Sequence, residues 1–60
     1  MEVKKIMSII NRKNKVIGFI QKETYDDLII FTINTKSIGM SFNELSEAVN
    51  YVKKFNYSLK

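Results

Sequence analysis

Three carboxylates form the only cluster of side chains in this sequence whose types and spacing suggest chemistry. They are Glu23, Asp26 and Asp27, within the segment KETYDD. Carboxylate oxygens suit Mg²⁺, and a small magnesium-dependent DNA nickase could use them. Neighbouring aspartates between two apolar runs are also ordinary turn residues. The nickase is therefore one hypothesis for these residues, and a structural turn is the other.

Other catalytic arrangements are excluded by composition. The 60 residues contain no His and no Cys, so Ser-His-Asp and Cys-His sites, Cys/His zinc sites and disulfides cannot form. The two glycines, Gly18 and Gly39, lie too far apart for a phosphate-binding glycine loop. We therefore predict that the protein is not an enzyme and uses no cofactor and no metal ion.

The charge of the chain favours an acidic partner. Ten Lys and Arg residues against six acids give a net charge of +4. Five of the ten lie in the first fifteen positions: Lys4, Lys5, Arg12, Lys13 and Lys15. A basic segment of this kind favours a polyanion such as nucleic acid. A charge of this size also serves solubility alone.

The apolar residues predict an α+β fold in a single domain covering residues 1–60. Three β-branched runs, at about 3–10, 15–22 and 28–34, are separated by short polar turns, and a short run at 37–40 follows. Such turns favour an antiparallel meander of four strands. Apolar residues then recur at helical spacing from 45 to 55, which predicts one C-terminal helix over about 42–55.

The junction between the last strand and the helix carries a capping pattern. Ser41 and Glu44 have the S-x-x-E spacing of a capping box, and Met40 and Leu45 have the spacing of a hydrophobic staple. We therefore predict a helix that begins just after Ser41. Gly39, before the junction, is interpreted as a position for an unusual backbone angle or a close approach.

Both faces of the predicted sheet are apolar. Leu28 and Ile30 alternate with Ile29, Phe31 and Ile33 along the third strand. One helix covers only one face, so a second copy of the chain is expected on the other, giving a homodimer. Exposed apolar residues on a small twisted sheet are the alternative interpretation. The residues predicted for a dimer or partner interface are Phe19, Ile29, Phe31, Tyr51 and Phe55.

The segment Gly39–Leu45, GMSFNEL, resembles the end of the single-stranded-DNA-binding transcriptional coactivator family (positive cofactor four), including its small bacterial and phage relatives. In that family a curved four-stranded sheet leads through a basic residue, glycine, an apolar residue and Ser or Thr into a helix. The resemblance implies a homodimer whose sheets bind single-stranded DNA or RNA through Lys, Arg and aromatic rings. The residues it implies for binding are Lys4, Lys5, Arg12, Lys13, Lys15, Lys22 and Lys36, with Phe19 and Tyr25 as stacking groups.

The hydropathy of the chain bears on its location. No apolar run approaches the roughly 20 residues that cross a bilayer, and the N-terminus lacks the apolar core of a signal peptide, so we predict a cytoplasmic protein without a membrane partner.

The composition also suggests a second function class. Abundant Ile, Asn and Lys suggest an AT-rich bacterial or phage genome. The alternative function is a phage or mobile-element inhibitor of host defence, of the anti-CRISPR kind, which binds a host protein or nucleoprotein.

Overall fold

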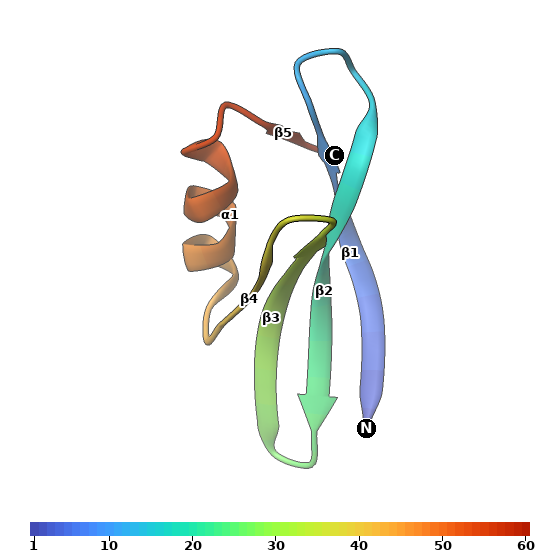
Figure 1. The fold of residues 1–60 in the computed structure, drawn as a ribbon. Helices are drawn as coiled ribbons and strands as arrows, with labels where there is room; N and C mark the ends of the chain where they lie inside the picture. Colours follow the sequence, from blue (N-terminus) through green and yellow to red (C-terminus); the bar gives the residue numbers. More distant parts are fainter.

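A computed structural model describes residues 1–60 and contains five strands and one helix (Figure 1). In chain order the elements are β1 (Glu2–Ile10), β2 (Val16–Tyr25), β3 (Leu28–Thr35), β4 (Gly39–Phe42), α1 (Leu45–Lys53) and β5 (Ser58–Leu59). The α+β class, the antiparallel meander and the single helix after it are confirmed. No helix has the length and apolar character needed to cross a membrane.

The sheet has the order β4-β3-β2-β1-β5, and all its neighbouring strands are antiparallel. The prediction of four strands is wrong because the chain after the helix returns to the sheet. Leu59 lies opposite Ile9 and Ser58 opposite Ile10, and Ser8 and Lys60 exchange two backbone hydrogen bonds of 3.1 and 3.0 Å. These bonds fix the C-terminal segment against β1.

The core lies between the helix and one face of the sheet. Ile9, Ile20 and Ile33 come from three neighbouring strands and are fully buried, and they pack against Ala48 and Val52 of α1. The strand side chains alternate between the two faces, and the helical pair has the i, i+4 spacing of one helix face. The apolar face predicted for the helix is therefore confirmed at Ala48 and Val52, but α1 ends at Lys53, before the predicted end at 55, and Phe55 is exposed.

The predicted helix start is wrong. Ser41 and Phe42 belong to β4, where they lie opposite Thr32 and Phe31, and the hydroxyls of Ser41 and Thr32 are 3.0 Å apart. The helix begins at Leu45, and Glu44 precedes it without a side-chain capping bond. The capping box and the staple do not form, because pairing β4 with β3 satisfies this backbone first.

Two other sequence predictions also change. Strand β2 continues to Tyr25, which leaves only Asp26 and Asp27 in the turn to β3; the positive φ of 52° at Asp26 suits such a tight turn. Gly39 has an ordinary negative φ and open space where a side chain would lie, so neither role predicted for it holds. Gly18, and not Gly39, lies where two backbone segments approach closely, since a Cβ at Gly18 would lie 2.3 Å from the carbonyl oxygen of Asn34.

Candidate nucleic-acid interface

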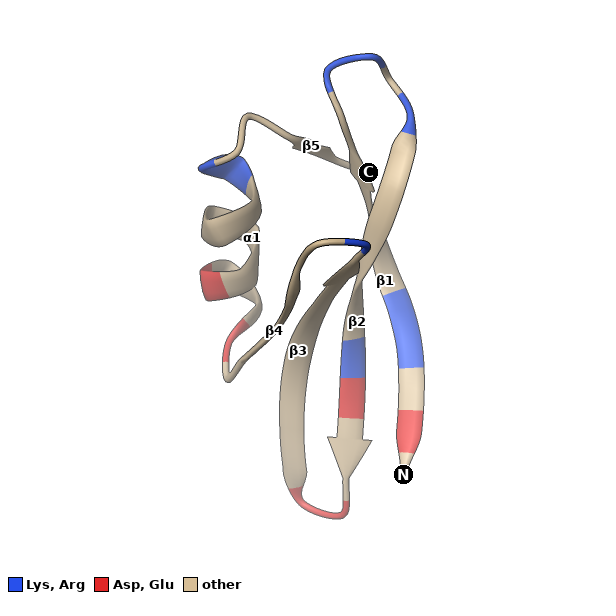
Figure 2. Ribbon diagram, viewed as in Figure 1, with Lys and Arg blue, Asp and Glu red and all other residues tan.

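Charge is unevenly distributed along the length of the molecule. Figure 2 shows blue alone at the β1–β2 turn, at the β3–β4 turn and at the end of α1, whereas red lies at the opposite ends of these elements, together with further blue on β1 and β2. We call the first group the basic end; its residues are Arg12, Lys13, Lys15, Lys36, Lys53 and Lys54. Because all six acids lie away from it, the local charge there exceeds the net charge of the chain.

The β1–β2 turn at the basic end is held by one asparagine. The Asn11 side-chain oxygen accepts hydrogen bonds from the backbone N–H groups of Lys13 and Lys15, at 2.9 and 3.0 Å. The Asn11 N–H donates to the Lys15 carbonyl, and Asn14 closes the turn with a φ of 63°. Asn favours both roles because its amide mimics a backbone group and it tolerates the left-handed region. The turn therefore presents Arg12 from a fixed backbone.

We expect Asn11→Ala to lower the free energy of unfolding by about 1 kcal/mol, because two turn hydrogen bonds are lost. Urea unfolding followed by circular dichroism measures this change. Asn11→Asp is the matched control, since it keeps the accepting oxygen and should keep nearly all the stability. If both variants lost the same stability, the side-chain oxygen would not be what holds the turn.

The β3–β4 turn is built in a similar way. The Thr35 hydroxyl oxygen accepts hydrogen bonds from the N–H groups of Ser37 and Ile38, at 3.2 and 2.9 Å, and the Thr35 N–H donates to the Ile38 carbonyl. These bonds fix the backbone of the residue between them, Lys36. Two ordered turns thus hold cations at the same end of the molecule.

Four aromatic rings form a row from β4 to the basic end. The Phe42 and Tyr51 ring centroids are 5.6 Å apart, those of Tyr51 and Phe55 are 5.3 Å apart, and those of Phe55 and Tyr57 are 5.9 Å apart. The last pair is stacked, at 20° between the ring planes. Phe55 is 42% exposed, so this ring, beside the β1–β2 turn, has free surface on which a base can stack.

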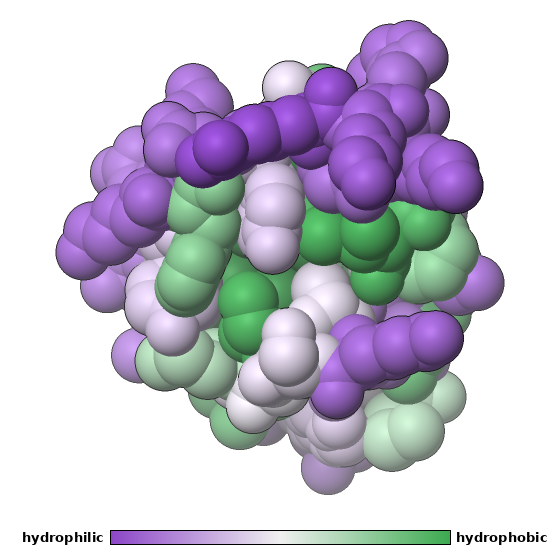
Figure 3. Space-filling view, turned by 45° about the horizontal axis from the view of Figure 1, so that its top comes forward, coloured by the Kyte–Doolittle hydropathy of each residue, from purple (hydrophilic) through white to green (hydrophobic).

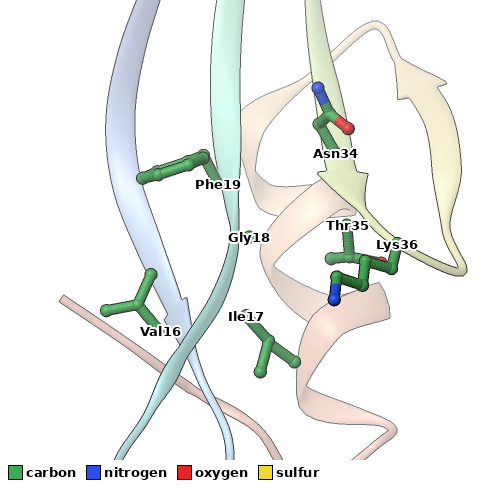
Figure 4. Close-up of a pocket in the computed structure, with 7 residues that line it drawn as sticks. All are labelled: Val16, Ile17, Gly18, Phe19, Asn34, Thr35 and Lys36. Carbon is green, nitrogen blue, oxygen red and sulfur yellow. The ribbon is translucent and has the colours of Figure 1, made fainter.

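Three open hollows lie in sequence, each sharing at least one lining residue with the next, and we call them together the groove. The first, of about 390 Å³, lies on the sheet between Phe19 and Lys36 (Figure 4). The second, of about 370 Å³, joins Lys36 to Tyr57. The third, of about 350 Å³, lies between Tyr57, Phe55 and the turn that carries Arg12. Figure 3 shows hydrophilic side chains around an apolar area at this end of the molecule.

The groove offers groups suited to a nucleic-acid strand. Its aromatic rings are Phe19 at one end and Phe55 and Tyr57 at the other, and its cations are Lys36, Arg12 and Lys13. Asn34 adds a side-chain amide, which both donates and accepts hydrogen bonds. In Figure 4 the Phe19 side chain extends toward β1, while Lys36 lies on the opposite side of the hollow, across β2.

The binding residues expected from the sequence do not all gather in this groove. Arg12, Lys13 and Lys36 line it, and Lys15 ends the β1–β2 turn beside them. The Lys5 ammonium lies 4.0 Å from the centroid of the Phe19 ring, which places a further cation next to the first hollow. Lys4 and Lys22 lie opposite each other on β1 and β2 and line no part of the groove.

Tyr25, the expected stacking residue, lies at the acidic end of the sheet. Its hydroxyl donates a hydrogen bond to the Glu23 carboxylate. This bond lowers the pKa of Glu23 and raises the pKa of Tyr25, because it stabilises the carboxylate and holds the phenol proton. The aspartates of the following turn do not join Glu23 in a group that could hold a metal ion.

The residues expected at a dimer or partner interface lie in different places. Phe19 is on the sheet face away from the helix, beside Lys5. Phe31 packs against the core and Ile29 is exposed near the β2–β3 turn. Tyr51 and Phe55 belong to the aromatic row. No single surface contains all five.

The sequence did not indicate Tyr57 or Asn34 as binding residues. Phe55 was predicted only for a dimer or partner interface and not for the groove. A signal was present, since Phe55 and Tyr57 follow the basic pair Lys53–Lys54. The return of β5 to β1 is what brings these rings to the β1–β2 turn. Comparison of the chain with protein-family models, with curated proteins and with solved structures finds no match.

Proposed function

We propose that this protein binds single-stranded nucleic acid in the groove at its basic end, without a chemical step. The observation that carries the proposal is a set of three hollows, neighbouring ones sharing lining residues, whose walls hold both aromatic rings and cations. Lys and Arg neutralise backbone phosphates, and aromatic rings stack on bases of any sequence. Together they make a site with little sequence preference.

Exposed rings favour a single strand over a duplex. A stacking contact needs the face of an unpaired base, and in a duplex these faces are covered by neighbouring base pairs. Phe55 has free surface at one end of the groove, and Phe19 lines the other end. A flexible strand can turn its bases toward both rings, whereas a duplex offers the groove only its phosphates.

Fluorescence anisotropy with a labelled oligonucleotide tests the proposal directly. DNA and RNA single strands, and a duplex of equal length, are titrated at about 50 and 200 mM salt. We expect the single strands to bind more tightly than the duplex, and their affinity to fall steeply as salt rises, because phosphate neutralisation releases counterions. Absence of binding at both salts would overturn the proposal and direct the search to a protein target.

The stacking contribution is tested at Phe55. We expect Phe55→Ala to weaken single-strand binding by about tenfold, since one base–aromatic stack contributes about 1–3 kcal/mol. Phe55→Trp keeps an aromatic face and should retain most of the affinity. Duplex affinity serves as the internal control: an equal loss for duplex and single strand would mean that the ring acts through the fold and not through stacking.

A further inference from the structure

Most of strand β1 has no neighbour on its outer side. β5 pairs with Ile9 and Ile10, and Lys60 pairs with Ser8. From Glu2 to Met7, strand β2 pairs with one edge of β1 and no strand covers the other. The backbone N–H and C=O groups on such a free edge are available to another strand.

This free edge also lies beyond the helix. In Figure 1 the first half of β1 and the β2–β3 hairpin extend past α1, which packs near β3, β4 and β5. Val3, near the start of the free edge, is 47% exposed. An apolar side chain here gains burial only if something is added beside β1.

The charges along the edge alternate in sign on one face of the strand. Glu2 and Lys4 are two residues apart and therefore share a face, and Val3 lies on the other. Lys4 is directly opposite Lys22 of β2, and two like charges in this position repel each other. An acid placed on the outer side of Lys4 would offset that repulsion.

We propose that a second copy of the chain adds to this edge, antiparallel to β1, about a two-fold axis at Val3. Each Val3 then lies opposite its symmetry mate, and each Glu2 lies opposite Lys4 of the other copy on the same face. The pairing forms two ion pairs and places an acid beside each Lys4. Two five-stranded sheets become one continuous sheet, closed by two-fold symmetry.

The charge pattern selects this register and this edge. Moving the axis by one residue to Lys4 would place Lys4 opposite Lys4. A second free edge, at Leu28–Ile30 of β3, has no charged side chain, so the same pairing there would form no ion pair.

In this dimer the two basic ends point away from each other, because the joined strands run in opposite directions. Each groove is then free to bind its own strand. The inference therefore does not rest on the proposed function, and the dimer should form without nucleic acid.

Charge exchange tests the register in solution. Light scattering should give twice the 7.0 kDa chain mass for the unchanged protein. Glu2→Lys and Lys4→Glu should each raise the dimer dissociation constant by about tenfold, because both symmetric pairs become repulsive. The double variant Glu2→Lys/Lys4→Glu should restore the dimer. A 7.0 kDa particle for the unchanged protein at millimolar concentration, or no rescue by the double variant, would overturn the inference.

A single introduced thiol tests the position of the axis. The chain has no cysteine, so Val3→Cys creates one unique thiol, and directly opposed strand residues lie within reach of a disulfide. Under mild oxidation we expect Val3→Cys to form a covalent dimer at least tenfold faster than the matched variant Leu28→Cys on the β3 edge. Equal rates, or faster crosslinking of Leu28→Cys, would overturn the proposed edge.

Discussion

Replacing Arg12 and Lys13 together by glutamate is expected to weaken single-strand binding by about a hundredfold at low salt. Both side chains line the third hollow beside Phe55 and Tyr57, and each reversal replaces attraction to a phosphate by repulsion. Loss of two phosphate contacts should also reduce the slope of log affinity against log salt by about 1.4, since each contact to a single strand contributes about 0.7. Anisotropy titrations at four or more salt concentrations measure both quantities.

A charge reversal outside the groove distinguishes binding at this site from a general effect of the net charge of the protein. Arg12→Glu and Lys22→Glu each change the net charge from +4 to +2, because one positive charge becomes one negative charge. Lys22 lies mid-sheet and lines no hollow of the groove. We expect Arg12→Glu to cost about tenfold in affinity and Lys22→Glu to cost less than about threefold. Equal losses would show that net charge alone drives binding.

Gly18→Ala is expected to have the largest effect on stability, a loss of about 3 kcal/mol in the free energy of unfolding. A Cβ at Gly18 would lie 2.3 Å from the Asn34 carbonyl oxygen and 2.5 Å from the Thr35 Cγ2 atom. The first of these atoms is backbone, so β2 and β3 must move apart, and overpacking of this kind costs about 1–3 kcal/mol or more. A 60-residue domain has little stability to lose, and urea unfolding measures the change.

Gly39→Ala is the matched control, because it makes the same chemical change at a site with no neighbouring atom within 4 Å and with a negative φ. We expect this variant to keep its stability or to gain about 0.5 kcal/mol, since alanine restricts the unfolded chain. If Gly18→Ala were as stable as Gly39→Ala, the close approach of β2 and β3 would have no energetic consequence.

Local patterns in the sequence predicted most of the secondary structure. The three β-branched runs lie in β1, β2 and β3, and the helical spacing of Ala48 and Val52 matches the buried face of α1. The helix prediction succeeded because burial of one face imposes a period of 3.6 on a helix. The capping box at Ser41 failed because its first two residues, Ser41 and Phe42, pair with β3, and a spacing rule does not weigh that alternative.

The candidate site was less predictable because it depends on contacts between distant segments. The sequence identified Arg12, Lys13 and Lys36 by their charge, but it also included Lys4 and Lys22, which lie away from the groove. Charge clusters along a strand do not indicate which face each side chain takes. A bulge between Lys5 and Met7 changes which face of the sheet each following side chain of β1 occupies. This irregularity has no clear signal in the sequence.

The sequence by itself determined the α+β class, the order of the first four strands and the helix, the absence of Cys and His chemistry, and the excess of positive charge. Each of these follows from composition or from short-range periodicity. Only the tertiary structure decided that β5 returns to β1, that Phe55 and Tyr57 meet the β1–β2 turn, and that the acids lie away from the basic end. Those features arise from pairing between Ile9 and Leu59, fifty residues apart; a two-residue strand carries too weak a local signal to be recognised before its partner is known.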